Sequence, residues 1–326
     1  MSGRSILFIS QGADHAPTRY RAKAYFPMLR AAGWEPAHLT AERGPGARMA
    51  LLRAARRAEV VVVLRKTFTP LFRLPLRLAA RRLVLDYDDA VFVRDDGTSS
   101  WVRAWHFAAM ARSCDAVWAG NAYLAEAARR HCPHVAVLPT SVDPAAYDPA
   151  ADKPTDHLDM VWIGSNSTRK YLEAVLPALA AAARRVPELR LKIVADFDLP
   201  HAPLPVWVVP WSSAGEAEAL ARAHIGIAPM PDDPWTRGKC GLKVLQYMAA
   251  GLPVVASDAG VHREIVVDGQ TGRLAAAEAR WEAALTALAT DPAARRAWGE
   301  AGRRRVQEHY STARTFEIMM QTLRTI

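Results

Sequence analysis

The sequence predicts an α/β protein built from two Rossmann-like, doubly wound domains. Glu59–Leu64 is a continuous apolar run, as expected for a parallel strand that is buried on both faces. Further strands, such as Leu158–Ile163, are expected at intervals along the chain. Stretches that alternate with these strands favour helices. The length of 326 residues fits two domains of ordinary size. We therefore expect one domain over residues 1–150 and a second over residues 151–309.

In the first half, strands are expected at residues 5–10, 36–40, 59–64, 83–85, 115–118 and 135–138. Helices are expected at 17–32 and 47–57, around Trp101 and Trp105, and at 121–130. Pro17 favours the start of the first helix and Gly33 its end. The two tryptophans are expected in the core or in a cleft. Residues 143–157, with three prolines and four aspartates, are predicted to link the domains.

The second half repeats the alternation. Strands are expected at residues 158–163, 191–195, 206–209, 225–228 and 254–256. Helices are expected at 169–185, 214–223, 242–250, 277–289, 293–308 and 312–323, with a kink possible at Pro177. This order of strands and helices is typical of a parallel sheet with helices on both faces.

The composition limits the classes of protein to consider. Three cysteines are too few for a disulfide framework, which favours a reducing, cytoplasmic location. No N-terminal run resembles a signal peptide, and no apolar stretch approaches the ~20 residues that span a bilayer. The sequence has no GxGxxG after its first strand, which disfavours a nicotinamide-binding enzyme. It has no Walker A motif either, because Cys240 follows Lys239 where that motif needs Ser or Thr.

Residues 237–258, RGKCGLKVLQYMAAGLPVVASD, carry most of the chemical information in the chain. Lys239 and Lys243 flank Gly241 just before the helix predicted at 242–250. A glycine-rich turn at a helix N-terminus offers free backbone N–H groups and the positive end of the helix dipole. Two lysines beside it add positive charge. The pattern fits a diphosphate-binding site, and it fits a solvated basic turn before a core helix equally well.

The same stretch resembles the nucleotide-sugar site of GT-B glycosyltransferases, close to family 4, the retaining group. Met248–Gly251 and Pro253–Val255 match the family pattern, and the chain is similar to a subgroup with the motif Lys-Cys-Gly-x-Lys-x-Leu-Gln-Tyr. Gly238 and Gln246 replace the two acidic residues of the family. The resemblance implies two domains that face each other across a cleft, and a C-terminal helix, about residues 310–326, that packs back on the first domain.

The resemblance also implies a donor-binding set. Gln246 takes the place of the acidic residue that holds the ribose hydroxyls, and its amide can both accept and donate hydrogen bonds. Gly164 matches the family's loop after a strand, Ser165 replaces its arginine, and Lys170 falls on its lysine. The loop leads from a strand directly into a helix, which is an anion-binding geometry. The loss of the first acidic residue leaves the identity of the sugar open.

Positive charge at this site is expected to take the place of a metal. Lys170, Lys239 and Lys243 are expected to neutralise the donor diphosphate, with Gly241 allowing the backbone to approach it. Lys243 is expected to act in catalysis by stabilising the departing diphosphate. Trp235, in the loop beside Lys239, is expected to stack on the donor sugar. No cofactor or metal is then required, and the nucleoside-diphosphate sugar is a substrate.

The run Asp86-x-Asp88-Asp89 allows three interpretations. Asp88 and Asp89 align with a His-Asp pair in the acceptor cleft of family 4, which implies a catalytic role on the acceptor side. Carboxylates after a strand are also how GT-A glycosyltransferases hold a divalent metal, so Asp86 and Asp88 could serve a metal-dependent transferase. A capping or core role stays open as well. His131-Cys132-Pro133-His134 lacks a second ligand pair for structural zinc, so a loop is expected there.

Two further regions suggest anionic partners. Arg19 and Arg21 lie in the first turn of a predicted helix, where the dipole disfavours cations, so they are candidate contacts to an anion or acceptor, or two solvated arginines. Arg48–Arg82 holds ten basic residues and one acidic residue, which accounts for the whole net charge of +9. Its interleaved apolar residues fit an interfacial membrane segment, or else the core of the first domain with a solvated basic face; those apolar residues are Phe68, Leu71, Phe72, Leu74 and Leu76.

The sequence thus predicts a cytoplasmic glycosyltransferase that moves a sugar from a nucleoside-diphosphate sugar to an acceptor hydroxyl in glycan, glycolipid or glycoside biosynthesis. The acceptor is lipid-linked or anionic if Arg48–Arg82 contacts the inner membrane face, and no nucleic-acid partner is expected. One alternative is a metal-dependent GT-A-like transferase that uses Asp86 and Asp88. Another is an inactive nucleotide-sugar-binding or scaffold protein, since the acidic pair of the family is missing.

Overall fold

The computed structural model describes residues 4–42 and 44–326, and the chain divides into two compact units. Unit 1 consists of the residues up to Ser141 together with Asp233–Cys240 and Thr312–Ile326. Unit 2 consists of Val142–Asp232 and Gly241–Ser311. The domain limits expected from the sequence, 1–150 and 151–309, differ from this division mainly at residues 142–150 and 233–240.

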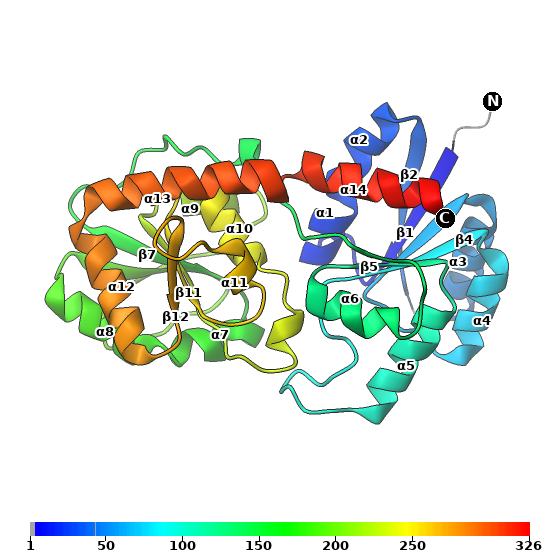
Figure 1. Ribbon diagram of the computed structural model, residues 1–326, viewed down its shortest axis with the longest axis horizontal. Coiled ribbons are helices and arrows are strands. Elements are labelled where there is room, and N and C mark those ends of the chain that lie inside the picture. The colour runs from blue at the N-terminus through cyan, green and yellow to red at the C-terminus, as the bar shows by residue number, and fades with distance from the viewer. Residues whose placement is uncertain (1–3, 43) are drawn as a thin grey trace. The chain divides into compact units, whose positions relative to one another are not determined.

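Unit 1 is built on a six-stranded parallel sheet with the order β2-β1-β3-β4-β5-β6 (Figure 1). Its strands are β1 (Arg4–Ser10), β2 (Trp34–Thr40), β3 (Val60–Leu64), β4 (Arg82–Tyr87), β5 (Ala116–Ala119) and β6 (Val135–Val137). Every residue of β3 is buried, as its uninterrupted apolar run predicts. The strand order reverses between β1 and β3, so a topological switch point lies at the carboxyl ends of these strands.

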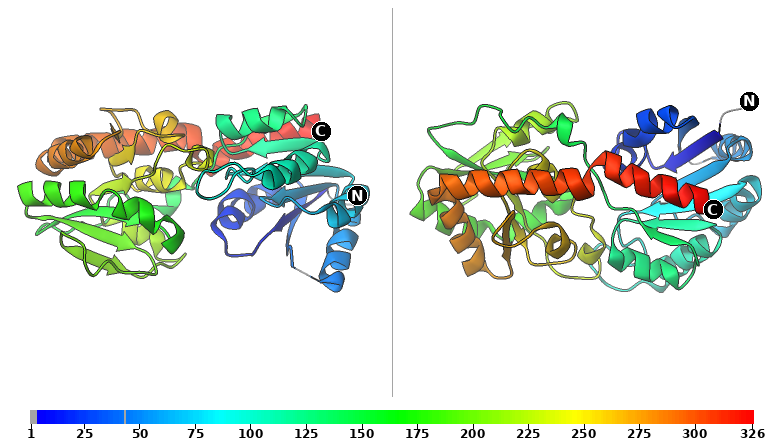
Figure 2. Two further views of the ribbon diagram at one scale, coloured as in Figure 1. Left: turned by 90° about the horizontal axis from the view of Figure 1, so that it is seen from below. Right: turned by 45° about the horizontal axis from the view of Figure 1, so that its top comes forward.

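Helices cover both faces of this sheet (Figure 2). They are α1 (Ala16–Arg21), α2 (Phe26–Ala31), α3 (Pro45–Arg57), α4 (Pro70–Ala79), α5 (Trp101–Arg112), α6 (Ala122–Arg129) and α14 (Thr312–Thr325). The single helix expected over 17–32 is divided into α1, a 3₁₀ turn and α2. Pro27 explains the break, because it has no N–H to continue the helical hydrogen bonds. Met319 and Leu323 of α14 are buried in one cluster with Phe8 of β1.

Unit 2 repeats the arrangement with the strand order β12-β11-β10-β7-β8-β9. Its strands are β7 (Leu158–Ile163), β8 (Leu189–Val194), β9 (Val206–Val209), β10 (Ile225–Ala228), β11 (Val254–Ser257) and β12 (Gly272–Ala275). All neighbouring strands are parallel. The order reverses between β7 and β10, which places the switch point of unit 2 where these two strands end.

The helices of unit 2 are α7 (Asn166–Glu173), α8 (Leu176–Arg185), α9 (Glu216–Ala221), α10 (Leu242–Ala249), α11 (His262–Ile265), α12 (Glu278–Thr290) and α13 (Pro292–Arg305). The helix expected over 169–185 is interrupted between α7 and α8, just before Pro177. Tyr247 of α10 accepts a hydrogen bond from the backbone N–H of Ile163, with 2.9 Å between the two atoms. This bond ties α10 to the carboxyl end of β7.

The two six-stranded parallel sheets, each with helices on both faces, confirm the predicted class of doubly wound α/β units. Within the described residues, every helix is too short or too polar to traverse a lipid bilayer.

Candidate active site

The candidate donor site lies at the switch point of unit 2, where ligands of doubly wound sheets bind. Gly164 and Ser165 follow β7, and Ser165 is the N-cap of α7. The segment that leads to α10 starts where β10 ends at Ala228. The backbone N–H groups at the start of α7 therefore point toward this edge of the sheet, together with the positive end of the helix dipole.

Lys243, in the first turn of α10, provides a cation at this switch point. Its Nζ lies 4.1 Å from the centroid of the Trp162 ring and donates a hydrogen bond of 3.2 Å to Thr168 Oγ1. A Cβ added to Gly164 would come within 2.7 Å of the same Nζ. The structure thus brings Gly164 and Lys243 together as neighbours, and adds Trp162 and Thr168, which the sequence reasoning did not single out.

Three other predicted donor-binding residues, Ser165, Lys170 and Gly241, lie at α7 or at the start of α10. Ser165 is exposed, and its hydroxyl is 2.9 Å from that of Ser167. Lys170 is exposed on α7, with its Nζ 5.2 Å from the centroid of the Tyr171 ring. Gly241 is the N-cap of α10 and has a φ of 70°, in the left-handed region that favours glycine.

Gln246 does not present its amide to solvent. Its side chain is only 3% exposed, because α10 is covered along Val244–Ala249 and not on one face alone. A ribose contact through this side chain, as the resemblance implies, would therefore need α10 or its neighbours to shift.

His262 is a further polar group near Lys243 that the sequence did not reveal. It opens α11, it is buried, and its Nδ1 donates to the carbonyl of Ser257 at 3.1 Å. Burial lowers its pKa to about 4, and the positive charge of Lys243 adds to this effect. His262 is therefore neutral at physiological pH. The sequence around His262 contains no motif that would predict its burial near Lys243.

Unit 1 holds a separate charged cluster at the carboxyl ends of β3 and β4. Arg65 follows β3 and has a φ of 55°, a strained conformation for a residue with a side chain. Its Nε donates to Asp88 Oδ1, and its Nη1 lies 2.6 Å from Asp89 Oδ2. Lys239 Nζ lies 2.7 Å from Asp89 Oδ1. The two carboxylates and the two cations thus form one network.

The network keeps Asp88 ionised. Burial opposes the charge of this carboxylate, but the charge and hydrogen bond of Arg65 outweigh burial and lower its pKa. Arg65 is the member of the network that the sequence reasoning missed as a site residue, since it was grouped with the membrane segment. Its signal lay in its place directly after a buried strand, one strand away from the aspartates.

The prediction that Arg21 contacts an outside anion is wrong. Arg21 is buried and forms a two-pronged ion pair with Asp86, with Nε 2.8 Å from Oδ2 and Nη2 2.5 Å from Oδ1. The anion that its position in a helical first turn suggested is therefore a carboxylate of the neighbouring strand β4. Arg19 is half-buried, with its guanidinium 5.1 Å from the centroid of the Tyr20 ring.

Lys239 and Trp235 differ from the sequence expectation in their surroundings. The segment 233–240 belongs to unit 1, where Trp235 packs against the apolar core and Cys240 is buried in it. Lys239 Nζ lies 4.5 Å from the centroid of the Trp235 ring while it pairs with Asp89. Both side chains are thus engaged within unit 1, so a diphosphate contact by Lys239 would have to compete with Asp89.

The His131–His134 loop behaves as expected for a loop. Cys132 Sγ contacts the carbonyls of Cys114 and His134 at 3.7 and 3.6 Å. Among the residues that the structure describes, no group of three or more His, Cys, Asp or Glu side chains is arranged to hold a metal ion.

Comparison with known proteins finds similarity over part of the chain. Residues 157–291 match the family model described as glycosyl transferases group 1. Over 117 residues the chain is 35% identical to an alpha-maltose-1-phosphate synthase of Mycolicibacterium smegmatis. That stretch covers 33% of this chain and 29% of the relative, so it spans less than a third of the relative's length.

Solved structures resemble the whole chain. The sucrose-phosphate synthase of Thermosynechococcus elongatus has a TM-score of 0.78 at 18% identity, covering 99% of this chain and 98% of that one. HepE of Anabaena, in complex with UDP and glucose, has a TM-score of 0.77 at 14% identity, covering 99% and 100%. These likenesses establish the fold. Residues 157–291 thus resemble the glycosyl transferases group 1 family, within a chain that has the GT-B fold.

Proposed function

We propose that the protein transfers a sugar from a nucleoside-diphosphate sugar to an acceptor hydroxyl, with retention of configuration and without a metal ion. The observation that carries this proposal is the position of Lys243. A cation lies at the switch point of a doubly wound unit, beside Gly164 and the N-terminus of α7, and this unit contains the group 1 match. Such a site suits a diphosphate.

In the proposed reaction, the bond from the anomeric carbon to the diphosphate oxygen breaks and a bond to the acceptor oxygen forms. The acceptor hydroxyl loses its proton, and negative charge grows on the departing diphosphate. Lys243 stabilises that charge together with the backbone N–H groups at the start of α7, because fixed donors lower the barrier where charge develops. Trp162 and Thr168 hold the Lys243 ammonium in place. Lys170 is a second, more exposed cation on α7.

The first donor to test is a UDP-sugar. HepE, which shares the fold, was solved in complex with UDP and glucose. The acceptor side is assigned to Asp88 and Asp89, as the family resemblance implies. Because Arg65 keeps Asp88 ionised, this carboxylate would accept a hydrogen bond from an acceptor hydroxyl and would not act as a general acid.

The metal-dependent alternative is less favoured by the geometry. It needs Asp86 and Asp88 to bind one cation together. Asp86 has both carboxylate oxygens on Arg21, and Asp88 is paired with Arg65. Each carboxylate would have to give up an arginine before it could bind a metal.

Calorimetry with UDP tests the donor site. Lys243→Ala is expected to weaken UDP binding by about 1.5–3 kcal/mol, the usual value of a charge-assisted hydrogen bond. Arg184→Ala, which removes an exposed cation of unit 2 on α8, serves as the matched control. If both variants bind UDP as the wild type does, Lys243 is not a diphosphate ligand.

Turnover of a panel of nucleotide sugars, followed by release of the nucleoside diphosphate, then separates the alternatives. Activity that survives EDTA agrees with the lysine-based site. Loss with EDTA and rescue by Mn²⁺ or Mg²⁺ favours the metal-dependent alternative. Binding of a donor without turnover of any donor and acceptor tested favours an inactive binding protein.

We further propose that unit 1 meets an anionic lipid surface through an exposed apolar face on α4 and α5, so that the acceptor is lipid-linked. Leu71 and Leu78 of α4 are 85% and 88% exposed, and Trp101 of α5 is 81% exposed. Leu74 and Trp105 are also exposed. Large apolar side chains rarely gather in this way on a surface that faces only water. We call these five residues the α4–α5 face.

The structure refines which residues of Arg48–Arg82 can serve this purpose. Phe72 and Leu76 are buried in the core, and Arg73 is buried as well. Arg65 is used by Asp88 and Asp89. Other arginines of the segment, including Arg48, Arg53 and Arg81, are exposed and can meet anionic headgroups. The expectation that Trp101 and Trp105 lie in a core or cleft is wrong, because α5 turns its first residues outward.

Flotation with anionic liposomes at low salt tests this face. Leu71→Asp/Leu78→Asp is expected to abolish binding, since it places two carboxylates where apolar side chains should enter the interface. Leu39→Asp/Trp207→Asp adds the same two charges at exposed apolar positions outside the face and should bind as the wild type does. Absence of wild-type binding to anionic liposomes rejects the membrane proposal and favours a water-soluble acceptor.

A further inference from the structure

Unit 2 contains a cavity of about 670 Å³ at the opposite edge of its sheet from the candidate donor site. His224 and Pro253 line it, and each comes just before a strand, β10 or β11. The donor-site residue Gly164 comes just after β7. Because all strands of this sheet are parallel, residues before strands and residues after strands lie at opposite edges. The remaining lining residues come mainly from α13 and from Pro149–Lys153.

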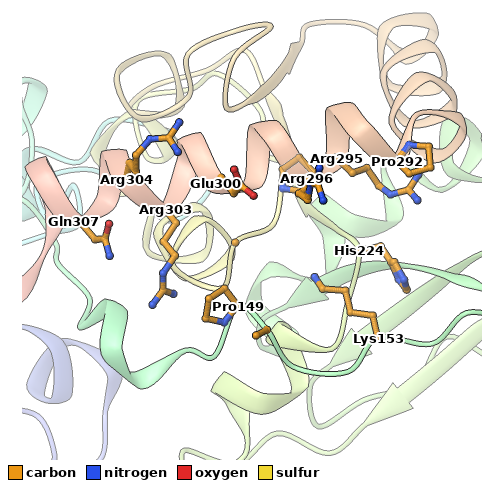
Figure 3. Close-up of a pocket in the computed structure, with 13 residues that line it drawn as sticks. Pro149, Lys153, His224, Pro292, Arg295, Arg296, Glu300, Arg303, Arg304 and Gln307 are labelled. Carbon is orange, nitrogen blue, oxygen red and sulfur yellow. The ribbon is translucent and has the colours of Figure 1, made fainter.

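The lining of this cavity is strongly basic. It contains five cations and one carboxylate, Glu300, which gives a formal charge of +4; the five cations are Lys153, Arg295, Arg296, Arg303 and Arg304. Figure 3 shows Arg303 extending from α13 toward the segment with Pro149, and Lys153 lying beside His224. Four cations from a single helix, α13, thus meet a fifth from another segment.

Three of these cations, Lys153, Arg295 and Arg303, are held in place by neutral groups. Lys153 Nζ donates to the carbonyl of Ala223 at 2.7 Å. Arg295 donates to the carbonyls of Leu288 and Ala289, both at 2.7 Å. Arg303 in turn donates to the carbonyls of residues 144 and 147. Within the described part of the chain, none of the five lining cations forms a salt bridge, so the carbonyls orient the positive charge without neutralising it.

This accumulation of like charge is unfavourable on its own. Burial lowers the pKa of Lys153 to about 8, and the charges of Arg295 and Lys192 add to the shift. His224 beside it has its pKa lowered to about 4, by burial first and then by Lys153. In both groups burial is the larger cause, and the neighbouring cations add to it in the same direction. An anion in the cavity would offset the contribution of those cations.

We propose that this cavity, which we call the α13 pocket, is a binding site for a small phosphate-bearing molecule. A phosphate group supplies the negative charge and the several acceptor oxygens that a cluster of guanidinium groups recognises. The volume is in the range of small-molecule sites. Pro149, Pro253 and Pro292 provide rigid apolar surface for the body of an organic phosphate. The proposal does not depend on the donor site or on transferase activity.

Calorimetry with inorganic phosphate and with glucose 6-phosphate tests the proposal, at constant ionic strength and with UDP present to occupy the donor site. The pocket variant is Arg296→Gln/Arg304→Gln, since both side chains are exposed and neither makes a hydrogen bond or ion pair in the described structure. The matched control is Arg184→Gln/Arg280→Gln, which removes two exposed arginines of unit 2 outside the pocket. Lys243→Ala removes the cation of the donor site.

The wild type, the control and Lys243→Ala are expected to bind one phosphate compound with similar affinity, and the pocket variant at least about tenfold more weakly. Tighter binding of glucose 6-phosphate than of phosphate assigns the pocket to an organic phosphate, and the reverse assigns it to the free ion. The pocket variant should fold, because it relieves repulsion between like charges; Lys153→Met provides an independent second variant. Equal affinity in the wild type and both pocket variants, loss only in Lys243→Ala, or no binding of either probe overturns the proposal.

Discussion

At the scale of single residues, Gly164 is expected to be needed for tight UDP binding, because a side chain at this position would displace the Lys243 ammonium. A Cβ at this position would lie 2.4 Å from the Trp162 ring and 2.7 Å from Lys243 Nζ. Gly164→Ala should therefore push the ammonium away from its place and weaken UDP binding about tenfold. Gly46→Ala is the control, since a Cβ there meets nothing within 4 Å. Calorimetry measures both, and unchanged binding by Gly164→Ala would show that the close contact is relieved without moving Lys243.

Arg65 is expected to set the ionisation of Asp88. Its charge and hydrogen bond are the largest of the influences that lower the pKa of Asp88, and Lys239 contributes less. Arg65→Gln should therefore raise the pKa of Asp88, because the carboxylate stays buried and loses its main counter-charge. Lys239→Gln should raise it by a smaller amount. Titration of the carboxyl carbon signals by NMR checks this order, and a larger shift in Lys239→Gln would contradict it.

Single residues also show what a sequence can and cannot reveal. The proximity of Gly164 and Lys243 could be predicted, because a loop between a strand and a helix has a known geometry and a lysine in a first helical turn has a known reach. Their role at a donor site stays a prediction. Arg21 was misjudged because the sequence does not show that Asp86, 65 residues later, occupies the adjacent place on β4. Arg65 and His262 gain their roles from strand order and burial, which only the folded chain defines.

At the scale of elements, the start of α10 depends on Gly241. This residue has a φ of 70°, and a Cβ on it would lie 2.3 Å from Ile265 Cδ1. Gly241→Ala combines left-handed strain, about 1 kcal/mol, with overpacking of about 1–3 kcal/mol. Gly33→Ala is the matched control, since Gly33 has a φ of 80° with nothing within 4 Å, and should lose the strain term alone. Denaturant unfolding measures both, and equal losses would mean that Ile265 moves aside freely.

The positions of the helices and strands were largely predictable from the sequence. Which face of each helix is buried was harder to predict. Strand β3 follows from the continuous apolar run 60–64, and β7 from the apolar residues 160–163 that come after Asp159. Helix α4 illustrates the limit, because its leucines point both ways. Leu76 is buried while Leu71 and Leu78 are exposed, and a helix that is apolar on more than one side does not reveal from its sequence which side meets the core.

At the scale of the whole molecule, the two-unit plan follows from length and from the repeated alternation of strands and helices. The assignment of residues 233–240 to unit 1 could not be read from the sequence. This segment lies between β10 and α10, two neighbouring elements of unit 2, and its place depends on Trp235 and Cys240 packing into the core of unit 1. Neither hydrophobic periodicity nor composition indicates that so short a segment of unit 2's sequence belongs to unit 1.

The pH dependence of folding should differ between the units, because unit 2 buries two neutral histidines. His224 accepts the backbone N–H of Asp159 at Nδ1 and lies 3.2 Å from the carbonyl of Pro154 at Nε2. This pattern requires the neutral ring, since Nδ1 has no proton to spare for the bond. His262 is neutral because burial lowers its pKa. The pKa of each is lowered from 6.5 to about 4.

A folded-state pKa below the unfolded value means that the unfolded chain takes up protons first as the pH falls. The stability of unit 2 is therefore expected to be intact above pH 6.5 and to fall between pH 6.5 and 4, by at most roughly 3 kcal/mol for each histidine. Hydrogen exchange followed by mass spectrometry can resolve the units, and unit 2 should lose protection over this range before unit 1.

His224→Asn keeps an acceptor for the N–H of Asp159, and His262→Asn keeps a donor for Ser257, so the double variant should lose most of this pH dependence. The same acid sensitivity in the double variant would assign the effect to other groups, such as carboxylates.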